Sequence, residues 1–400
     1  MKILQLCHKV PYPPRDGGCI AMNNITKGLL ELGCNVKILA INTPKNKIHV
    51  EKLPKPYIES TNIEAVFVNT SIKAIDAFKN LFSNESYNIQ RFISDDFKKK
   101  LTEILSESSF DIILLESLFL TPYLAIIKKH SKAKIVLRSH NIEFEIWERQ
   151  MKNCKNPIKK AYLNILANRL KKIEQYHLNN VAGIAAITNR DADKMKELGC
   201  NVPIVTIPVG IDKQDTFHQP KDKPKNSLSL FHLGAMDWKP NQEAIKWFLE
   251  KVWEKAKESQ PGLQLYLAGN NMPKWLIKNK DSNIHIKGYV KNSKQFIQEN
   301  DIMIVPILSG GGMRVKIIEG MSLGKVIIST TIGAEGINYT NNKNILIADT
   351  PEEFLQCLQH CTNNNTKDQI GKKAIELTEE QYDNKIISKK LLDFFHGLLK

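Results

Sequence analysis

Short apolar segments alternate with helix-patterned segments along most of the chain, and this alternation restricts the fold more than any other feature. The first apolar run, 2–8, leads through a glycine-bearing loop into 20–32, where apolar residues recur at helical spacing before Gly33. Strands separated by helices form parallel sheets. The first half is therefore predicted to be a doubly wound α/β domain, with further strands at 35–41, 111–116, 133–139 and 181–188.

The alternation stops in a polar stretch and then restarts, which predicts two domains. Residues 210–226 contain four lysines and three aspartates with little to bury, as an exposed linker does. The chain length of 400 residues also suits two domains better than one core. Short apolar strands of the kind covered on both faces return at 228–234, 263–269, 284–290, 301–307, 326–330 and 344–348.

The resulting fold prediction is α/β with two Rossmann-like, doubly wound parallel-sheet domains that face a cleft. Ligands of such sheets bind at the carboxyl ends of the strands, so we expect the site in that cleft. The predicted parts are an N-terminal acceptor domain at 1–210, a linker at 211–226, a C-terminal donor domain at 227–380, and a helix at 381–400 that packs back on the N-terminal domain.

A net charge of +15 calls for an anionic partner: nucleic acid, a membrane surface or anionic substrates. The lysines are spread along the chain and no basic block is interleaved with aromatics, which argues against nucleic acid. Residues 149–172 combine many basic residues with apolar residues at helical spacing, either as a solvated helix face or as a membrane-surface contact. No run of 18 apolar residues is present. We predict a cytoplasmic protein, peripherally bound to the inner face of the cytoplasmic membrane.

The cysteine and aspartate patterns favour neither a disulfide framework nor a metal site. None of the seven cysteines forms a C-x-x-C pair, which is typical of free thiols in a reducing compartment. Cys357, His360 and Cys361 share a helix face, but three closely spaced ligands are too few for a structural zinc. Asp191 and Asp193 open a helical run, where acidic residues match the helix dipole. We therefore expect no metal and no other cofactor.

Two motifs of the first half lie where a ligand of a parallel sheet would bind. Gly17 and Gly18, between the first strand and helix, allow close backbone approach, and the helix N-terminus suits a phosphate. The alternative is an ordinary turn, and the pattern is not the G-x-G-x-x-G of dinucleotide oxidoreductases. His140 follows a predicted strand and is a catalytic candidate. The candidates for the acceptor side are Glu116, Asn141 and Glu143.

The strongest motif is 309–321, which reads Ser-Gly-Gly-Gly-Met-Arg-Val-Lys-Ile-Ile-Glu-Gly-Met after a predicted strand. A helix starting near Met313 would place Gly312, Lys316 and Glu319 on one face, with Arg314 in the first turn. A helix N-terminus with arginine and lysine suits a diphosphate, and Glu319 could accept hydrogen bonds from a ribose diol. The predicted donor-binding residues here are Gly311, Gly312, Met313, Arg314, Lys316 and Glu319, of which Arg314 and Lys316 are also catalytic candidates.

This region resembles the family 4 glycosyltransferases. Glu319, within Ile-Glu-Gly-Met-Ser-Leu-Gly-Lys-Val-Ile-Ile, is similar to the second glutamate of that family's E-x7-E motif. Residues 234–241 resemble the opening of a subgroup's C-terminal domain, and 208–212 resemble the stretch before its linker. Gly17, Gly18 and His140 fall where the family has donor-loop glycines and a cleft histidine. The resemblance implies the GT-B fold, a nucleotide-sugar donor and retention of anomeric configuration.

The chain departs from the family pattern at two places. Gly311 stands where the first E-x7-E glutamate would be, which leaves the role of that glutamate unfilled. Ala235 and Met236 stand where a basic residue usually follows the first glycine of the C-terminal domain. Arg314 and Lys316 are the residues that could replace the lost positive charge.

The function predicted from these features is transfer of a sugar from a nucleotide-diphosphate sugar to a glycan or lipid-linked acceptor, in cell-surface polysaccharide or glycolipid synthesis. Cations and helix N-termini would stabilise the leaving diphosphate without a metal. No carboxylate nucleophile is evident, which favours same-face displacement over a covalent intermediate. The alternatives are a nucleotide-sugar epimerase of the same fold and a non-catalytic nucleotide-sugar-binding or scaffolding protein.

Overall fold

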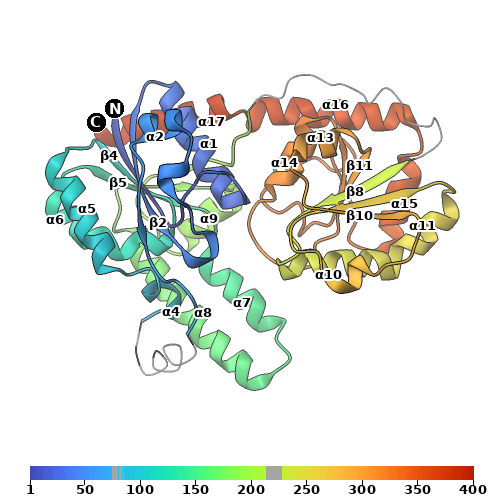
Figure 1. Cartoon of the computed structure of the whole chain (residues 1–400), viewed down its shortest axis with the longest axis horizontal. Coiled ribbons are helices and arrows are strands. Elements are labelled where there is room, and N and C mark those ends of the chain that lie inside the picture. The colour runs from blue at the N-terminus through green and yellow to red at the C-terminus, as the bar shows by residue number, and fades with distance from the viewer. Residues whose placement is uncertain (74–79, 81–82, 84, 213–227) are drawn as a thin grey trace. The chain divides into compact units, whose positions relative to one another are not determined.

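The protein consists of two compact α/β units, as a computed structural model of the chain shows (Figure 1). The structure describes residues 1–73, 80, 83, 85–212 and 228–400. The first unit comprises Met1–Gly210 together with Asn384–Lys400, and the second comprises Ile211–Asp383. Of the predicted linker at 211–226, only Ile211 and Asp212 are among the described residues.

The first unit is built on a seven-stranded parallel sheet with the order β3-β2-β1-β4-β5-β6-β7. The central strands are buried on both faces, as their continuous apolar sequences require. Strand order reverses beside β1, so the carboxyl ends of β1 and β4 form a topological switch point. The strands are β1 (Lys2–Cys7), β2 (Asn35–Asn42), β3 (Glu64–Phe67), β4 (Ile112–Leu115), β5 (Lys134–Ser139), β6 (Gly183–Ala186) and β7 (Ile204–Thr206).

The two edge strands, β3 and β7, are absent from the sequence-based prediction. Each has at most four residues, and none of their side chains is fully buried. Such strands lack the continuous apolar run by which a strand covered on both faces is recognised. Pairing with β2 and β6, which no local pattern encodes, places them in the sheet.

Helices cover both faces of this sheet and enclose two apolar cores. Helix α17, although last in the chain, packs beside α1, where Ile387, Leu391 and Phe395 join the core that also contains Ile25 and Leu29 (Figure 1). The α-helices of the unit are α1 (Gly17–Glu31), α2 (Lys55–Thr61), α4 (Tyr87–Gln90), α5 (Asp95–Glu107), α6 (Leu124–His130), α7 (Glu143–Lys152), α8 (Pro157–Leu178), α9 (Asn189–Glu197) and α17 (Asn384–Leu399). Short 3₁₀ turns lie at η1 (Pro44–Asn46), η2 (Val50–Lys52) and η3 (Leu118–Tyr123).

Helices α7 and α8 form an antiparallel hairpin that extends away from the sheet of the first unit (Figure 1). The sequence pattern predicts one long basic helical region here, and that prediction is wrong at 153–156, where the chain turns. Pro157 occupies the first turn of α8, and the Asn156 side chain caps it by accepting from the Lys159 amide at 3.0 Å. Proline and a capping asparagine are start signals, so a new helix begins there.

The second unit has a six-stranded parallel sheet with the order β10-β9-β8-β11-β12-β13. Apolar clusters lie on both of its faces. The strands are β8 (Ser229–Leu233), β9 (Gln264–Ala268), β10 (Ile284–Gly288), β11 (Ile302–Val305), β12 (Val326–Ser329) and β13 (Leu346–Ile347). The helices are α10 (Lys239–Phe248), the π-helical η4 (Leu249–Trp253), α11 (Glu254–Ser259), α12 (Lys274–Ile277), α13 (Ser293–Gln298), α14 (Val315–Ser322), α15 (Pro351–His360) and α16 (Asn364–Gln381).

The carboxyl ends of β8 and β9 are packed backbone against backbone. Gly269 has φ +149°, and a Cβ there would lie 1.8 Å from the carbonyl oxygen of Gly234. A Cβ on Gly234 would in turn meet the side chains of Asn241 and His232. Gly269 is required because a side chain there would force the two strand ends apart, and a side chain at Gly234 would displace those of Asn241 and His232.

In the part of the chain that the structure describes, no helix has the length and apolar character needed to cross a membrane.

Candidate active site

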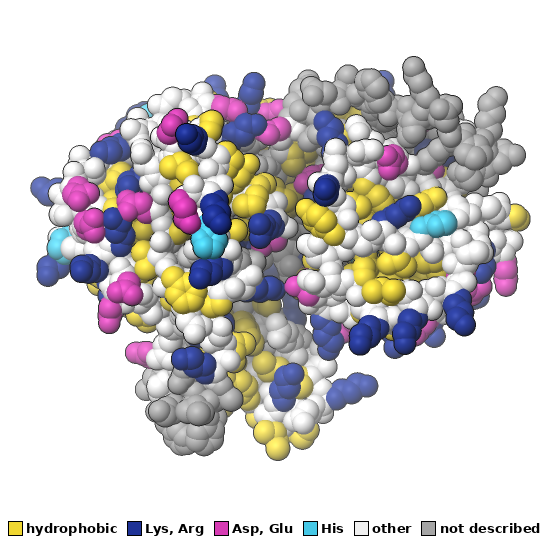
Figure 2. All heavy atoms as spheres, viewed as in Figure 1, with side chains coloured by type: hydrophobic (Ala, Val, Ile, Leu, Met, Phe, Trp, Pro, Cys, Tyr) yellow, Lys and Arg dark blue, Asp and Glu magenta, His cyan; other side chains and the backbone are white. Residues whose placement is uncertain are grey.

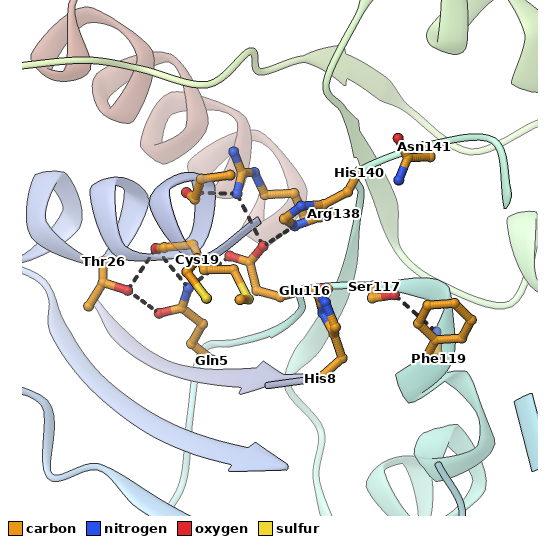
Figure 3. A network of polar contacts seen from close by, with 12 residues as sticks. Gln5, His8, Cys19, Thr26, Glu116, Ser117, Phe119, Arg138, His140 and Asn141 are labelled. Carbon is orange, nitrogen blue, oxygen red and sulfur yellow. Dashed lines mark hydrogen bonds and ion pairs between the residues drawn. The ribbon is translucent and has the colours of Figure 1, made fainter. Parts of the chain in front are cut away.

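A buried polar network centred on Glu116 lies at the carboxyl edge of the first unit's sheet (Figure 3). Glu116 directly follows β4. Its Oε1 accepts a hydrogen bond from Gln5 Nε2 at 2.7 Å. Its Oε2 accepts from Arg138 Nη1 at 3.1 Å and from His140 Nε2 at 2.8 Å. The side chains of Glu116 and Arg138 are both completely buried.

Sheet topology brings these residues together, because β1, β4 and β5 are neighbours and run in one direction. Helix α1 is tied to the same network. Thr26 donates from Oγ1 to Gln5 Oε1 at 2.6 Å, and Arg138 Nη1 also donates to the carbonyl of Ala21 at 3.0 Å. The network therefore fixes α1 against the strand ends on which Glu116 and Arg138 lie.

Glu116 is ionised at neutral pH despite its burial. Burial by itself would raise the pKa of the carboxyl, but the Arg138 guanidinium and the hydrogen bond from His140 outweigh it and hold the pKa at about 2. The Glu116 carboxylate therefore carries a negative charge at neutral pH, where it is hydrogen-bonded to His140.

This carboxylate determines which nitrogen of His140 carries the proton. Burial lowers the pKa of His140, so the ring is neutral near pH 7. An ionised carboxylate only accepts hydrogen bonds, so Nε2 of His140 holds the hydrogen and Nδ1 keeps its lone pair. The side chain is 12% exposed. The arrangement therefore offers Nδ1 as an acceptor for a hydroxyl group.

His8, which directly follows β1, stands beside His140 with ring centroids 5.9 Å apart. Its Nδ1 lies 2.7 Å from the carbonyl oxygen of Glu116 and donates to it. Burial, the charge of Lys9 and the neighbouring His140 lower the pKa of His8 to about 3. Two neutral imidazoles thus line this strand edge.

The remaining acceptor-side candidates lie where α7 begins. Asn141 Nδ2 is 3.4 Å from Glu143 Oε1, and burial raises the pKa of Glu143 to about 7. Glu174 of α8 accepts from the backbone amides of Glu143 and Phe144, each at 3.2 Å. Burial and the nearby Glu143 raise the pKa of Glu174 to about 8. The base of the hairpin thus contacts the segment that follows His140.

Gly17 and Gly18 are the first two residues of α1. Asp16 caps this helix by accepting from the Cys19 amide at 2.9 Å, and Lys9 pairs with Asp16 at 2.7 Å. The Lys9 ammonium also lies against Gly18, where a Cβ would be 2.9 Å from it. The Lys9 ammonium, paired with Asp16, therefore lies next to the two glycines.

In the second unit, the glycine loop after β11 leads into α14, but the helix begins at Val315 and not near Met313. Gly310 and Gly312 have φ +108° and +83°, in the left-handed region that favours glycine. Gly312 therefore lies outside the helix and does not share a face with Lys316 and Glu319, contrary to the prediction. Arg314 is the N-cap residue, one position before the first turn.

Arg314 lies at the start of α14 and is held there by the loop itself. Its guanidinium donates to the carbonyl of Gly312 and lies 5.6 Å from the ring centroid of Trp238. A Cβ on Gly310 would come within 2.9 Å of the same indole ring. Arg314 is also the only arginine after Arg190 in the sequence. A guanidinium held over an indole ring by a cation–π contact has a restricted orientation, which suits bidentate binding of an anion.

Lys316 and Glu319 share one face of α14 and form an ion pair at 2.6 Å. Both side chains are partly exposed, at 35% and 20%. Glu319, which is predicted to accept hydrogen bonds from a ribose diol, is thus ion-paired with Lys316 in this structure. Gly311 and Met313 are partly buried in the adjoining loop. The candidate residues fall into two groups, one in each unit: Glu116, His140, Asn141 and Glu143 with Gly17 and Gly18, and 311–319.

Sequence reasoning missed Gln5, Thr26 and His8, and it assigned no role to Arg138. A signal for Gln5 was available, because it is the one strongly polar residue in the apolar run Ile-Leu-Gln-Leu-Cys. A buried polar side chain in a strand covered on both faces needs a hydrogen-bonding partner. The partner, Glu116, is 111 residues away, and only the sheet order reveals it.

No group of three or more His, Cys, Asp or Glu side chains able to hold a metal occurs among the residues described. Asp191 and Asp193 lie in α9, where the Thr188 side chain caps the helix by accepting from the Asp191 amide at 3.0 Å.

Comparison with known proteins identifies both halves of the chain. Residues 17–215 match the family described as Glycosyltransferase Family 4, and residues 227–364 match Glycosyl transferases group 1. An uncharacterized 44.6 kDa protein in the cps region of Klebsiella pneumoniae is 22% identical over 395 residues, covering 96% of this chain and 97% of that protein.

Solved structures share the fold over the full length of the chain. Sucrose-phosphate synthase from Thermosynechococcus elongatus has a TM-score of 0.73 at 12% identity, covering 100% of this chain and 99% of that chain. HepE from Anabaena, solved in complex with UDP, has a TM-score of 0.65 at 14% identity, covering 99% of this chain and 100% of that chain.

Proposed function

Because the chain is a family 4-like glycosyltransferase with the GT-B fold, we propose that it transfers a hexosyl or related sugar from a nucleotide-diphosphate sugar to a glycan or lipid-linked acceptor. The cps-region relative supports a role in cell-surface polysaccharide or glycolipid synthesis. HepE, which was solved with UDP, supports a nucleotide-sugar donor.

The observation that carries this proposal is the cationic start of α14. Transfer breaks the bond between the anomeric carbon and the donor diphosphate, and negative charge builds on the leaving oxygens. Arg314, held over the Trp238 ring, and Lys316 in the first turn of α14 would bind this diphosphate together with the free helix amides. Interactions that strengthen as the charge develops accelerate the reaction. No metal ion or other cofactor is needed in this scheme.

The Lys316–Glu319 ion pair would rearrange when the donor binds. Lys316 would turn from Glu319 toward the diphosphate, which frees the Glu319 carboxylate to accept hydrogen bonds from the ribose hydroxyls. The pair thus keeps both side chains near α14 before the donor arrives. Gly311, Gly312 and Met313 would contact the donor through the loop backbone, and Gly17 and Gly18 would add the amides at the start of α1.

His140 would hold a sugar hydroxyl of the donor or acceptor at its Nδ1, with Glu116 fixing the tautomer. Asn141 and Glu143 would border the acceptor. We propose retention of configuration by same-face displacement. In this reaction the acceptor oxygen attacks the anomeric carbon from the side of the departing diphosphate, and a phosphate oxygen takes the acceptor proton.

We further propose that the protein works in the cytoplasm, peripherally attached to an anionic membrane surface at which a lipid-linked acceptor would lie. The net charge of +15 supports this proposal.

The decisive experiment measures release of nucleoside diphosphate and sugar transfer with a panel of nucleotide sugars. We expect Arg314→Ala to lower kcat by a hundredfold or more, because one lost charge-stabilising donor typically has an effect of that order. Arg314→Lys should recover part of the rate, and Lys246→Ala, an exposed lysine on α10, should leave it unchanged. Wild-type turnover in Arg314→Ala would refute the diphosphate assignment.

The same assay separates the alternatives. An epimerase would convert the sugar of the donor without releasing nucleoside diphosphate. A non-catalytic protein would gain thermal stability from a nucleotide sugar, because a ligand bound only by the folded state raises Tm, but would turn nothing over.

A further inference from the structure

The hairpin tip, defined as residues 152–161 at the junction of α7 and α8, has an unusual charge pattern. From Arg149 to Ile173 the chain contains eight basic residues and no acidic residue. Four of the eight are Lys152, Lys155, Lys159 and Lys160 of the tip, and all four side chains are exposed. Figure 2 shows basic and hydrophobic side chains at the far end of the hairpin and no acidic side chain among them on the face in view.

The same tip exposes apolar side chains. Ile158 is 82% exposed, the highest value among the exposed large hydrophobic residues that the structure describes, and Ile165 is 38% exposed. Together with the partly buried Tyr162 they occur at i, i+4 and i+7, which places them in one row along α8. The exposed members of the row lie on a different side of α8 from the residues that it buries, which include Leu163, Leu166, Ala167 and Leu170. Helix α8 therefore exposes Ile158 and Ile165 in addition to the apolar residues that it buries, whereas Tyr162 of the same row lies near Tyr87 and Arg91 of the first unit.

We propose that the hairpin tip docks on an anionic lipid surface, with its lysines among the headgroups and Ile158 inserted below them. This inference deepens the proposed membrane association by naming the contact. Clusters of lysine attract anionic leaflets, and an apolar residue beside them gains stability by leaving water. A soluble anionic polysaccharide would satisfy the lysines but leave Ile158 in water, so the apolar row favours lipid.

The geometry of the hairpin suits this role. Its two helices pack closely on each other, and it extends from the sheet of the first unit, so the tip can reach a surface without unfolding (Figure 1). At its base, Glu174 binds the backbone amides of Glu143 and Phe144. The docking element is thus joined to the segment that follows His140. Docking would hold the first unit, and with it the proposed acceptor side, near lipid-linked acceptors.

The test is co-sedimentation of the full-length protein with vesicles, without any donor. One set contains phosphatidylcholine alone, and the other contains phosphatidylcholine and phosphatidylglycerol in roughly equal parts. We expect binding to the second set only, and weaker binding as salt rises, because exposed charges are screened. Binding that is absent at low salt, or equal on both sets, overturns the proposal.

Variants locate the contact. Lys159→Glu/Lys160→Glu should weaken binding by at least about 25-fold, since each lysine near an anionic surface contributes about fivefold. The matched control is Lys389→Glu/Lys390→Glu, which makes the same charge change at two exposed lysines of α17 in the same unit. An equal loss in the control variant would show that net charge and not the tip is responsible, and would overturn the proposal.

The variant Ile158→Ser distinguishes docking on a lipid surface from binding to a soluble polyanion. We expect it to weaken vesicle binding severalfold, while binding to heparin, a soluble polyanion, stays unchanged. Unchanged vesicle binding in this variant overturns the insertion of Ile158. Unfolding curves should match wild type, because the side chain is exposed. Glycosyl transfer is measured separately with a soluble acceptor, so failure of docking and failure of the proposed activity are distinguishable.

Discussion

Replacing Arg138 should expose how strongly the buried network depends on charge compensation. Arg138→Met removes the guanidinium but keeps a long, unbranched apolar side chain at this fully buried position. The Glu116 carboxyl then retains only His140 and Gln5 as hydrogen-bond donors. Because Arg138 is the largest influence lowering the pKa of Glu116, its loss lets burial raise that pKa.

The size of the effect follows from the depressed pKa. A fall from 4.5 to about 2 corresponds to roughly 3 kcal/mol in favour of the ionised carboxylate. Breaking a buried ion pair by removing one partner typically costs about 3–5 kcal/mol of stability. We therefore expect Arg138→Met to lower the free energy of unfolding of the first unit by about 3–5 kcal/mol near pH 7.

The sign of the pH dependence provides a second check. In the wild type, the depressed pKa of Glu116 stabilises the fold above about pH 4.5, and this contribution is lost as the pH falls through about 2. In Arg138→Met the pKa of Glu116 is raised, so the ionised carboxylate destabilises the fold and its protonation removes an uncompensated buried charge. The difference in stability between the variant and the wild type should therefore shrink as the pH falls from about 7 to about 5.

Urea unfolding, followed by circular dichroism at about pH 7 and at about pH 5, measures these changes in the free energy of unfolding. The double variant Glu116→Gln/Arg138→Met should be more stable than Arg138→Met near pH 7, because it buries no unpaired charge. A coupling energy of about 1–3 kcal/mol between the two positions is expected. Strictly additive effects, or a deficit of the same size at both pH values, would refute the reasoning.

Three further outcomes are expected. The raised pKa of Glu174 means that its contribution to stability is present below about pH 4.5 and is lost as the pH rises through about 8; Glu174→Gln should flatten this part of the pH–stability profile, and an unchanged slope would contradict the assignment. Gly269→Ala should unfold or strongly destabilise the second unit, by more than about 3 kcal/mol, because its Cβ would lie 1.8 Å from the Gly234 carbonyl; Gly397→Ala, with no atom within 4 Å of its Cβ, is the control and should be nearly neutral in a thermal melt. Sugar transfer should survive a chelator, and activity that is abolished by it and restored by magnesium or manganese would show that the reaction needs a metal ion.

Local sequence determined the elements of each unit and the places where chemistry could occur. Apolar runs mark the central strands because both of their faces are buried, so every residue of such a strand is selected for the core. Gly310 and Gly312 mark a loop because their positive φ values are accessible mainly to glycine. The start of α8 was also encoded locally, by Asn156 and Pro157, although the basic pattern around them obscured it.

Tertiary structure alone decided which polar side chains meet and in what protonation state. Gln5, Glu116 and Arg138 become neighbours only because β1, β4 and β5 are adjacent in the sheet. The charge of Glu116 and the tautomer of His140 then follow from burial and from those neighbours. Desolvation and Coulomb interactions depend on distances in space, and a residue's own sequence context does not carry them.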